Sequence, residues 1–396
     1  MIASDPSGGK SNAQHILCPM PAPLQPSQTG NATPVRLCYV HCYRDPDYTR
    51  ARRQIDALRS MHGVDLHLAT TRHRGPARYL ELLGALWRVH RTTRPDIYLV
   101  GFRGHEIFGL IKCIAGRRPV IFDALMSPGS ALREEGRAGW VGRLLAPAAC
   151  FLERRVLHAA TLILTDTPQH VSHYRSAFDV AANSIVALPV GAVEATGTPP
   201  SRSGGPFRVL FYGSFLPLHG VDVIVRAAAT LRDLDIEFRF IGGNSSAAAR
   251  LSKRCAELQI QGYRHLPWMP FDELLEREIP EADLCLGGPF GDTPQARRVV
   301  TTKTTQCLAL GRPTVVGAID GEFGFSNRQN CLLVAQNDPA ALAEAIRWAV
   351  ENQSALRAIG HAGRKLYRER FSLDVIAAGL SAALDAIRPD ARSGRP

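Results

Sequence analysis

The chain has 396 residues, a hydrophobic content of 45% and a formal net charge of +11, values that fit a globular protein of two or three domains. We expect no membrane span and no secretory signal, because no apolar run reaches about 18 residues and the first residues lack a short apolar core. The nine scattered cysteines argue against a disulfide framework or a zinc site, so we expect a cytoplasmic protein with reduced thiols.

The predicted elements alternate between strands and helices along most of the chain. Residues 1–33 are rich in Pro, Ser, Gln and Gly and are predicted to be disordered. Strand-like and helix-like segments alternate over residues 34–198, a Gly/Pro/Ser linker covers 199–206, and the alternation resumes over 207–370. The last segment, 371–396, is predicted to be helical and could pack back on the N-terminal domain.

The strands expected in both regions are near-continuous apolar runs. Such strands are typical of parallel sheets that helices cover on both faces, an α/β architecture. Right-handed crossovers would place every loop that follows a strand at one edge of its sheet, where such folds bind ligands. The runs are VRLCYVHC, DLHLAT, DIYLVGF, PVIFDAL, TLILTDT and SIVALPV in the first region, and RVLFYGS, EFRFIGG, YRHLPWM, ADLCLGG and PTVVGA in the second.

Positive charge is concentrated in the first half of the chain. Residues 1–200 hold 23 Lys and Arg against 15 Asp and Glu. This balance suggests an acidic partner, such as an anionic membrane surface or a phosphorylated substrate, although an arginine-rich genome would give the same composition. We expect no nucleic-acid partner, because the chain shows no recognised motif and no interleaving of aromatic and basic residues.

A helix-like stretch in this half, GWVGRLLAPAACFLERRVLHAA, mixes large apolar residues with basic ones. Two interpretations stay open. The helix could rest on an anionic lipid interface, or it could face the core with ordinary basic flanks. The residues concerned are Trp140, Leu144, Leu145, Phe151 and Leu152, with Arg143, Arg154 and Arg155.

The second region opens with FYGSFLPLHGVD, residues 211–222, in which an apolar run leads through a loop into a helix. Amides at the helix start and the helix dipole would favour an anion there. Gly220 permits the close approach of a phosphate or of another backbone segment, and His219 could donate a hydrogen bond to a phosphate oxygen. The alternative is a turn with a surface histidine. The glycine spacing fits neither a dinucleotide fingerprint nor a phosphate loop.

A second stretch, residues 287–317, reads GGPFGDTPQARRVVTTKTTQCLALGRPTVVG and again follows a strand. Lys303 lies near the start of a helix predicted from about Thr302, where the dipole alone would prefer an anion. A bound diphosphate would reconcile the lysine with the dipole. The alternative is a solvated surface face that carries arginines and a lysine.

Residues 207–350 resemble bacterial retaining glycosyltransferases of family 4, the group 1 glycosyltransferases with the GT-B fold. The matching segments, in the family's order, are FYGSFLPLHGVDVIVRAA, FIGG, LPWMPFDEL, EADLCLGG, FGDTPQARRVVTTKTTQCLALGRPTVVG and NCLLVAQNDPAALAEAI. The resemblance implies two Rossmann-like domains facing across a cleft, with the acceptor on residues 34–198 and the donor on 207–370. It also implies transfer of a hexose from a nucleotide-diphosphate sugar to an acceptor hydroxyl, with retention at the anomeric carbon.

The resemblance further implies the partners. The acceptor would be a glycan or a lipid-linked glycan in cell-surface polysaccharide synthesis, and the protein could contact an anionic membrane at the inner face of the cell membrane. No metal and no other cofactor is expected. A nucleotide-sugar epimerase on the same fold and a donor-binding scaffold without turnover stay open as alternatives.

The candidate site residues come from the strand-end loops and from the family's motif positions. Four residues are candidates for catalysis: His105, Asp123, Arg298 and Lys303. Asp123 could instead cap a helix or a turn. The candidates for donor binding are Gly213, Ser214, His219, Gly220, Trp268, Met269, Phe290, Gly291, Thr293 and Gln306.

Two pairs of positions depart from the family pattern. Ser214 and His219 stand where many members have an Arg and a Lys that hold the donor diphosphate. Arg298 and Gln306 stand where many members have two Glu residues, the second of which holds the ribose hydroxyls. Gln306 keeps only an uncharged hydrogen bond for that purpose. Arg298 and Lys303 are therefore expected to contribute more of the binding of the diphosphate.

Overall fold

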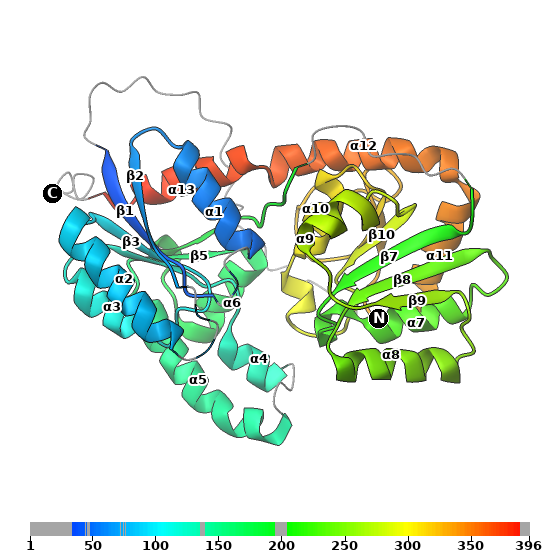
Figure 1. Cartoon of the computed structure of the whole chain (residues 1–396), viewed down its shortest axis with the longest axis horizontal. Helices are drawn as coiled ribbons and strands as arrows, with labels where there is room; N and C mark the ends of the chain where they lie inside the picture. Colours follow the sequence, from blue (N-terminus) through cyan, green and yellow to red (C-terminus); the bar gives the residue numbers. More distant parts are fainter. Residues whose placement is uncertain are drawn as a thin grey trace, which may run out of the picture. The chain divides into compact units, whose positions relative to one another are not determined.

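The computed structural model describes residues 34–388, apart from residues 44, 46, 47, 72, 74, 76, 135–138 and 195–203. The predicted disordered tail, residues 1–33, and most of the predicted linker, 199–206, lie outside the described residues. Two parallel six-stranded sheets with flanking helices form the described part of the chain (Figure 1), which confirms the predicted α/β architecture.

The first sheet has the strand order β2-β1-β3-β4-β5-β6, and every neighbouring pair is parallel. All residues of β3, β4 and β5 are buried, because helices cover both faces of the sheet. The strands are β1 (Val35–Val40), β2 (Val64–Ala69), β3 (Ile97–Val100), β4 (Val120–Asp123), β5 (Leu162–Thr165) and β6 (Ile185–Ala187).

Side chains of β1 alternate between two separate cores. Cys38 and Val40 pack under α2, α3, α5 and α6, whereas Leu37 and Tyr39 pack under α1 and α13 on the opposite face. The C-terminal helix α13 thus lies against α1 of the first sheet, although it follows the second sheet in the chain. The helices are α1 (Thr49–Ser60), α2 (Arg78–Thr93), α3 (Phe108–Ala115), α4 (Pro128–Glu134), α5 (Gly139–Ala159), α6 (Pro168–Phe178) and α13 (Leu373–Asp385).

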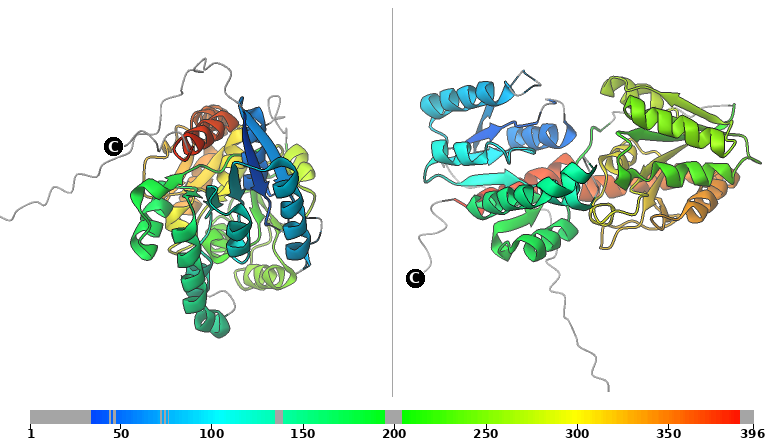
Figure 2. Two further views of the ribbon diagram at one scale, coloured as in Figure 1. Left: turned by 90° about the vertical axis from the view of Figure 1, so that its left-hand side faces the viewer. Right: turned by 90° about the horizontal axis from the view of Figure 1, so that it is seen from below.

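The second sheet has the strand order β12-β11-β10-β7-β8-β9 and is also parallel. Helices α7, α8, α11 and the start of α12 cover one face, and the α9 region with α10 covers the other, a two-sided arrangement visible in Figure 2. The strands are β7 (Phe207–Gly213), β8 (Ile236–Gly242), β9 (Tyr263–Leu266), β10 (Leu284–Gly288), β11 (Thr314–Gly317) and β12 (Leu332–Val334). The helices are α7 (Val221–Ala229), α8 (Ser245–Glu257), α9 (Phe271–Glu273), α10 (Thr302–Ala309), α11 (Pro339–Glu351) and α12 (Gln353–Arg370).

The segment that leaves β6 is tied to two helices of the second sheet. The Gln306 side chain accepts a hydrogen bond from the Val193 N–H at 3.0 Å and donates one to the Val193 carbonyl at 2.7 Å. The Tyr367 hydroxyl makes the same pair of bonds with the Ala192 backbone, at 3.1 and 3.0 Å. These four bonds hold the segment against α10 and α12.

Within the described ranges, no helix is both long enough and apolar enough to cross a bilayer.

Candidate functional site

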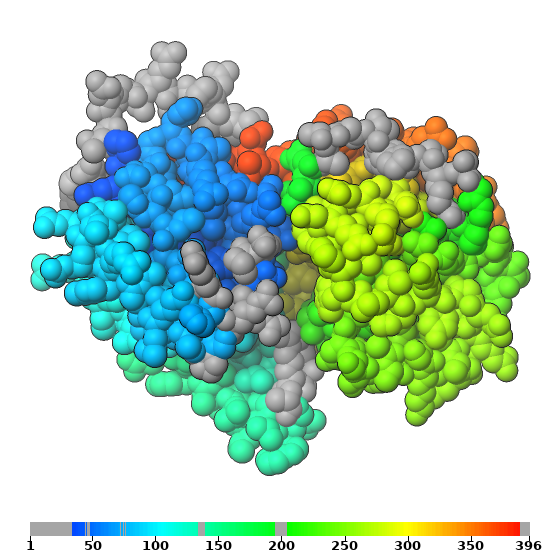
Figure 3. Space-filling model, in the orientation of Figure 1, coloured from blue at the N-terminus to red at the C-terminus, as the bar shows by residue number. Residues whose placement is uncertain are grey.

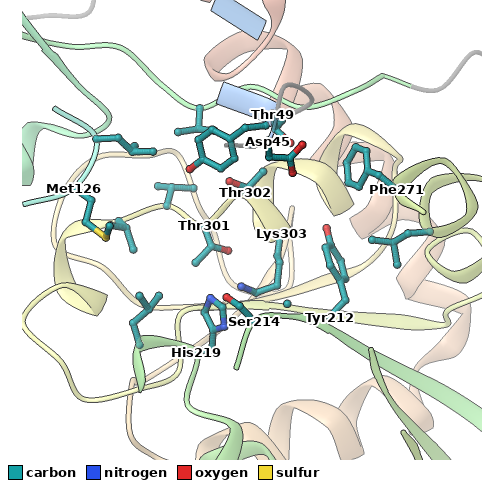
Figure 4. A pocket seen from close by; sticks show the side chains of 18 of the residues that line it. Asp45, Thr49, Met126, Tyr212, Ser214, His219, Phe271, Thr301, Thr302 and Lys303 are labelled. Carbon is teal, nitrogen blue, oxygen red and sulfur yellow. The ribbon is translucent and has the colours of Figure 1, made fainter. Parts of the chain in front are cut away.

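A pocket of about 860 Å³ lies where the carboxyl ends of the strands in both sheets meet. Asp45, Tyr48 and Asp166 line it from loops of the first sheet. Ser214, Trp268 and the start of α10 line it from the second sheet. Figure 4 shows Lys303 pointing toward Ser214 and His219, with Asp45 and Thr49 on the opposite side. The predicted position of a ligand site, at the strand ends, agrees with this pocket.

The loop after β7 brings a histidine to the pocket in a defined tautomer. His219 is buried, at 8% exposure, and its ring lies edge-on to Phe211 with the ring centres 5.9 Å apart. The Leu216 N–H donates to Nδ1 of His219 at 3.3 Å. A neutral ring that accepts at Nδ1 carries its proton on Nε2. His219 can therefore donate a hydrogen bond from Nε2.

Two glycines lock this loop to the loop after β10. Gly220 has φ +65°, and a Cβ there would lie 2.5 Å from the Phe290 carbonyl carbon. The Gly291 N–H donates to the Leu218 carbonyl at 3.0 Å, and a Cβ on Gly291 would overlap the Pro217 carbonyl oxygen. Both glycines thus serve the close approach of two backbone segments.

Lys303 lies in the first turn of α10 and is the most buried cation at the pocket, at 6% exposure. Burial lowers the pKa of its ammonium to about 7. Its Nζ lies 5.5 Å from the centre of the Phe211 ring. Among the described residues, no carboxylate forms an ion pair with it. A Cβ on Gly213 would lie 3.2 Å from His219 Cε1 and 3.6 Å from Lys303 Nζ, so all three groups meet at one point.

The start of α10 adds backbone N–H groups beside the lysine that have no acceptor within the helix. The Thr301 hydroxyl caps the helix by accepting from the Thr304 N–H at 3.2 Å, and it donates to the Gly287 carbonyl at 2.7 Å. The N–H groups of Thr302 and Lys303 have no acceptor within the helix, because the first turn lacks i−4 carbonyls. The cap, the helix dipole and Lys303 together make this corner favourable for an anion.

The first sheet contributes a carboxylate that sequence reasoning missed. Asp166 follows β5, is 7% exposed and lines the pocket. Its Oδ1 is hydrogen-bonded to Nδ1 of His170, one turn later in α6. The only available signal was its place directly after the run LILT, at the strand end where ligand loops are expected.

Residues 206–352 match the family model described as glycosyl transferases group 1. Over 234 residues the chain is 27% identical to D-inositol 3-phosphate glycosyltransferase 1 of Catenulispora acidiphila, an alignment that covers 54% of each protein. The chain spans about half the length of the curated relatives it matches.

Two solved structures resemble the chain over nearly their whole length. Sucrose-phosphate synthase of Thermosynechococcus elongatus matches with a TM-score of 0.69 and 16% identity, over 89% of this chain and 98% of that one. Alr3699/HepE of Anabaena, solved in complex with UDP-glucose, matches with a TM-score of 0.63 and 14% identity, over 89% and 99%. The fold is GT-B.

Six of the predicted site residues line the GT-B pocket. Trp268 and Met269 lie on its wall after β9, and Ser214 is exposed to it. The six are Gly213, Ser214, His219, Trp268, Met269 and Lys303.

Asp123 does not face the pocket, contrary to prediction. It is fully buried, and the Arg50 guanidinium donates to its carboxylate from Nε and Nη2 at 2.7–2.9 Å. Gln54 donates to it as well, at 3.2 Å. Arg50 also donates to the Leu188 and Thr165 carbonyls, at 2.9 and 3.1 Å. The carboxylate therefore belongs to a buried ion pair that ties α1 to the sheet.

His105 is likewise wrongly predicted to face the cleft. It is 4% exposed, does not line the pocket, and packs edge-on against Phe122 with ring centres 4.7 Å apart. Neither ring nitrogen has a hydrogen-bond partner among the described residues. Burial lowers its pKa to about 3, so the ring is neutral at ordinary pH. It therefore acts as part of the core.

Gln306 and Arg298 were predicted to contact the donor, but neither lines the pocket. Gln306 has no exposed surface, and its amide oxygen and nitrogen both bond Val193 as described above, so it does not reach a ribose. Arg298 is half-buried outside the pocket lining. Its backbone carbonyl accepts from the Thr167 hydroxyl. Burial of His173 is the main reason that its pKa is lowered to about 4, and the positive charge of Arg298 lowers it further.

The remaining predicted donor-binding residues shape the loops. Gly220 and Gly291 pack backbone against backbone, Phe290 is 1% exposed in the core of the second sheet, and none of the three lines the pocket. The Thr293 hydroxyl accepts from the Ala296 N–H at 3.1 Å, which caps the turn before Arg298. Gly220 and Gly291 hold the loop that presents His219 against the loop after β10, and contact of these four residues with the donor stays a prediction.

Proposed function

We propose that this chain is a glycosyltransferase that moves a sugar from a nucleotide-diphosphate sugar to an acceptor hydroxyl. One observation carries the proposal: a buried lysine, for which the described residues supply no carboxylate partner, stands at a capped helix start on the wall of a pocket between two Rossmann-like sheets. An isolated buried ammonium is unfavourable, and a bound diphosphate would supply the missing negative charge. The family match over residues 206–352 and the GT-B fold support the same function.

The proposed donor site uses four sets of groups. The diphosphate accepts hydrogen bonds from the Lys303 ammonium, the amides at the start of α10, Nε2 of His219 and the Ser214 hydroxyl. The nucleoside lies against Trp268 and Met269, which line the same pocket. This arrangement replaces the Arg and Lys that many family members carry in the loop after β7 with one buried lysine and neutral donors.

In the proposed reaction, the bond between the anomeric carbon and the diphosphate oxygen breaks, and its electron pair stays on the phosphate. Lys303 and the α10 amides stabilise the negative charge that develops on this leaving oxygen. The acceptor hydroxyl attacks the anomeric carbon from the same face, and its proton passes to the leaving phosphate. The configuration is thereby retained, as in family 4, and no protein base is required for this step.

The acceptor side is the wall formed by the first sheet. Asp166, held by His170, lines the pocket, and so does Asp45, which lies on the opposite side from the lysine (Figure 4). Carboxylates can accept hydrogen bonds from sugar hydroxyls, so this wall suits a glycan or lipid-linked glycan acceptor. The transferred sugar is proposed to be a hexose, added during the synthesis of cell-surface polysaccharide. The positive charge needed at the leaving group comes from Lys303 and backbone amides, so we propose a reaction without a resident metal. We also propose that the protein contacts a membrane surface without spanning it.

A donor-binding scaffold without turnover is the second candidate. The observation that favours it is Gln306, which stands where many members hold ribose with a Glu and is instead bonded to Val193. An epimerase on the same fold would use the same donor pocket but no acceptor.

The experiment is proton NMR of the full chain with UDP-, GDP-, TDP- and ADP-sugars, with and without glycan acceptors. The proposal expects release of one nucleoside diphosphate and a product whose anomeric configuration equals that of the donor. An inverted product contradicts retention, and conversion of the sugar to its epimer contradicts transfer. Binding without any release of nucleoside diphosphate identifies the scaffold. Lys303→Ala should slow release by about 10²–10³-fold, whereas the exposed-lysine control Lys253→Ala should not.

A further inference from the structure

The hydroxyl of Tyr212 is a buried polar group that the described part of the chain leaves without a partner. Tyr212 is the last residue but one of β7, is 8% exposed and lines the pocket. Of the residues that line the pocket, it alone has a buried side-chain oxygen or nitrogen that makes no hydrogen bond within the described ranges. Buried polar groups in folded proteins are nearly always hydrogen-bonded. An unpaired hydroxyl on the wall of a pocket therefore points to a polar group on a ligand.

The groups that surround this hydroxyl inside the protein are weak partners. The Tyr212 ring lies in one core cluster with Ile241 and Leu274, between the second sheet and the α9–α10 layer. Its electrostatic neighbours are the thiols of Cys307 and Cys285, and a thiol sulfur is only a weak acceptor. Burial raises the pKa of the phenol well above its usual value of 10. The hydroxyl therefore keeps its proton and can donate it in a hydrogen bond.

Tyr212 lies between the corner proposed for the diphosphate and the wall proposed for the nucleoside. Gly213 follows it on β7 and pairs with Gly242 of β8. A Cβ on Gly213 would lie 3.6 Å from Nζ of Lys303, and a Cβ on Gly242 would lie 3.0 Å from Cε2 of Trp268. The ammonium and the indole thus stand at neighbouring strand ends, one residue beyond Tyr212. A nucleotide that spans them passes the end of β7 beside Tyr212.

The wall on the other side of Tyr212 is apolar. Figure 3 shows a recess between the blue atoms of the first sheet and the yellow atoms of the second. In Figure 4, Tyr212 lies between Lys303 and Phe271, with its oxygen directed into the pocket. The pocket-lining residues that follow Trp268 carry no charge and no side-chain hydrogen-bond donor; they are Met269, Pro270, Phe271 and Leu274. The Tyr212 hydroxyl is thus a single polar group at the edge of an apolar surface.

We propose that Tyr212 is a specificity-determining residue for the nucleotide, whose nucleoside part accepts a hydrogen bond from the Tyr212 hydroxyl. Small-molecule pockets fix the orientation of a ligand with a few polar groups set in an apolar wall, and this hydroxyl is such a group. Lys303 binds the diphosphate of any nucleotide, whereas Tyr212 contacts only a ligand that carries a nucleoside. This inference deepens the proposed function and rests on it, because it requires a nucleotide in this pocket.

The test is isothermal titration of the full chain with UDP, GDP, TDP and ADP, and with pyrophosphate, which has a diphosphate but no nucleoside. Competition against a bound nucleotide gives the affinity for pyrophosphate. Tyr212→Phe should raise the dissociation constant of each nucleoside diphosphate that binds by about fivefold, the effect of one neutral hydrogen bond, and should leave pyrophosphate binding unchanged. Lys303→Ala should weaken the binding of both kinds of ligand.

Tyr174 supplies a matched control. Its hydroxyl is also buried and has no hydrogen-bond partner among the described residues, but Tyr174 does not line the pocket. Tyr174→Phe should therefore bind each nucleotide as wild type does. Neither Tyr174→Phe nor Tyr212→Phe should lower the melting temperature, because neither substitution removes a hydrogen bond from the folded protein.

Three results would overturn the inference. The first is equal binding of the nucleotides by wild type and Tyr212→Phe. The second is an equal loss of pyrophosphate binding, because the hydroxyl then acts on the phosphates. The third is a lower melting temperature for Tyr212→Phe, which would assign the hydroxyl to the fold. A wild-type protein that binds no nucleoside diphosphate contradicts the proposed function as well, whereas the other three results leave that function standing.

Discussion

The ammonium of Lys303 lies 5.5 Å from the centre of the Phe211 ring, in the first turn of a helix whose N-terminus opens on the pocket. The ring offers its negative face to the cation, yet Phe211 carries no charge that could balance a buried ammonium. The pKa of Lys303 is therefore lowered to about 7. A ligand with two phosphates would restore the charge balance, and the donor site rests on this relationship.

Replacing Lys303 by alanine removes the one charged group that contacts the proposed leaving phosphate. We expect kcat/KM to fall by about 10²–10³, the scale for losing one preorganised charge-stabilising donor. Steady-state release of nucleoside diphosphate measures the effect, with Lys253→Ala as the exposed control. A Lys303→Ala protein that is folded and retains wild-type kcat/KM would contradict the proposed role.

Binding of nucleoside diphosphate should weaken as the pH rises above about 7. In the free protein Lys303 loses its proton near that pH, whereas a bound phosphate stabilises the ammonium and raises its pKa. Binding above pH 7 must then take up a proton, so the dissociation constant should rise up to about tenfold per pH unit. Calorimetric titrations from pH 7 to pH 9 measure it. In Lys303→Gln this dependence should be absent, and an equally steep profile in that variant would assign the titration to another group.

Asp123→Asn should destabilise the fold rather than impair catalysis directly. The variant leaves the fully buried Arg50 guanidinium without its carboxylate, and breaking a buried pair in this way costs about 3–5 kcal/mol. Urea unfolding measures the loss. Arg50→Met with Asp123→Leu removes both charges and should lose less than the single variant. A single variant as stable as wild type would show that the pair contributes nothing.

Glu153→Gln should be more stable than wild type at high pH. Burial raises the pKa of this carboxyl from 4.5 to about 7, so between these values the folded state binds more protons than the unfolded state. Its contribution to stability is present below pH 4.5 and is lost as the pH rises through about 7. The stability difference between variant and wild type should therefore grow by about 3 kcal/mol from pH 4.5 to pH 8, measured by urea unfolding. A difference that does not change with pH would mean that Glu153 titrates normally.

The rule that ligand-binding loops follow the strands of a parallel sheet explains both which site residues the sequence predicted and which it missed. Continuous apolar runs identify parallel strands, and the loops after them do form the pocket, which is why Ser214 and Lys303 were found. The same rule failed for Asp123, because the last residue of a strand can point to either face of the sheet. Asp123 follows Phe122, which packs in the core on one face, and so points to the other face, toward Arg50. Nothing local shows that Arg50, 73 residues earlier, lies there.

Gln306 and Asp166 show the limit set by distant partners. Gln306 stands where many family members bind ribose with a Glu, so the sequence predicted a weaker ribose ligand. In the structure, however, its amide is hydrogen-bonded to the backbone of Val193, 113 residues away. Asp166 is placed at the pocket by the strand end after β5, where the local pattern gave no reason to prefer it over Asp123. The large apolar residues of α5 were visible in the sequence, but only the packing of the helix on the sheet shows which of them are buried.

The central claim is that the corner formed by Lys303, His219 and the start of α10 holds the diphosphate of a nucleotide sugar. Isothermal titration of the full chain with UDP, GDP, TDP and ADP at pH 7 tests it most directly, alongside Lys303→Ala and the control Lys253→Ala. The account predicts that at least one nucleoside diphosphate binds wild type and Lys253→Ala equally, and Lys303→Ala at least about tenfold more weakly, the equivalent of about 1.4 kcal/mol. Binding of none of the four, or equal binding by all three proteins, would contradict it.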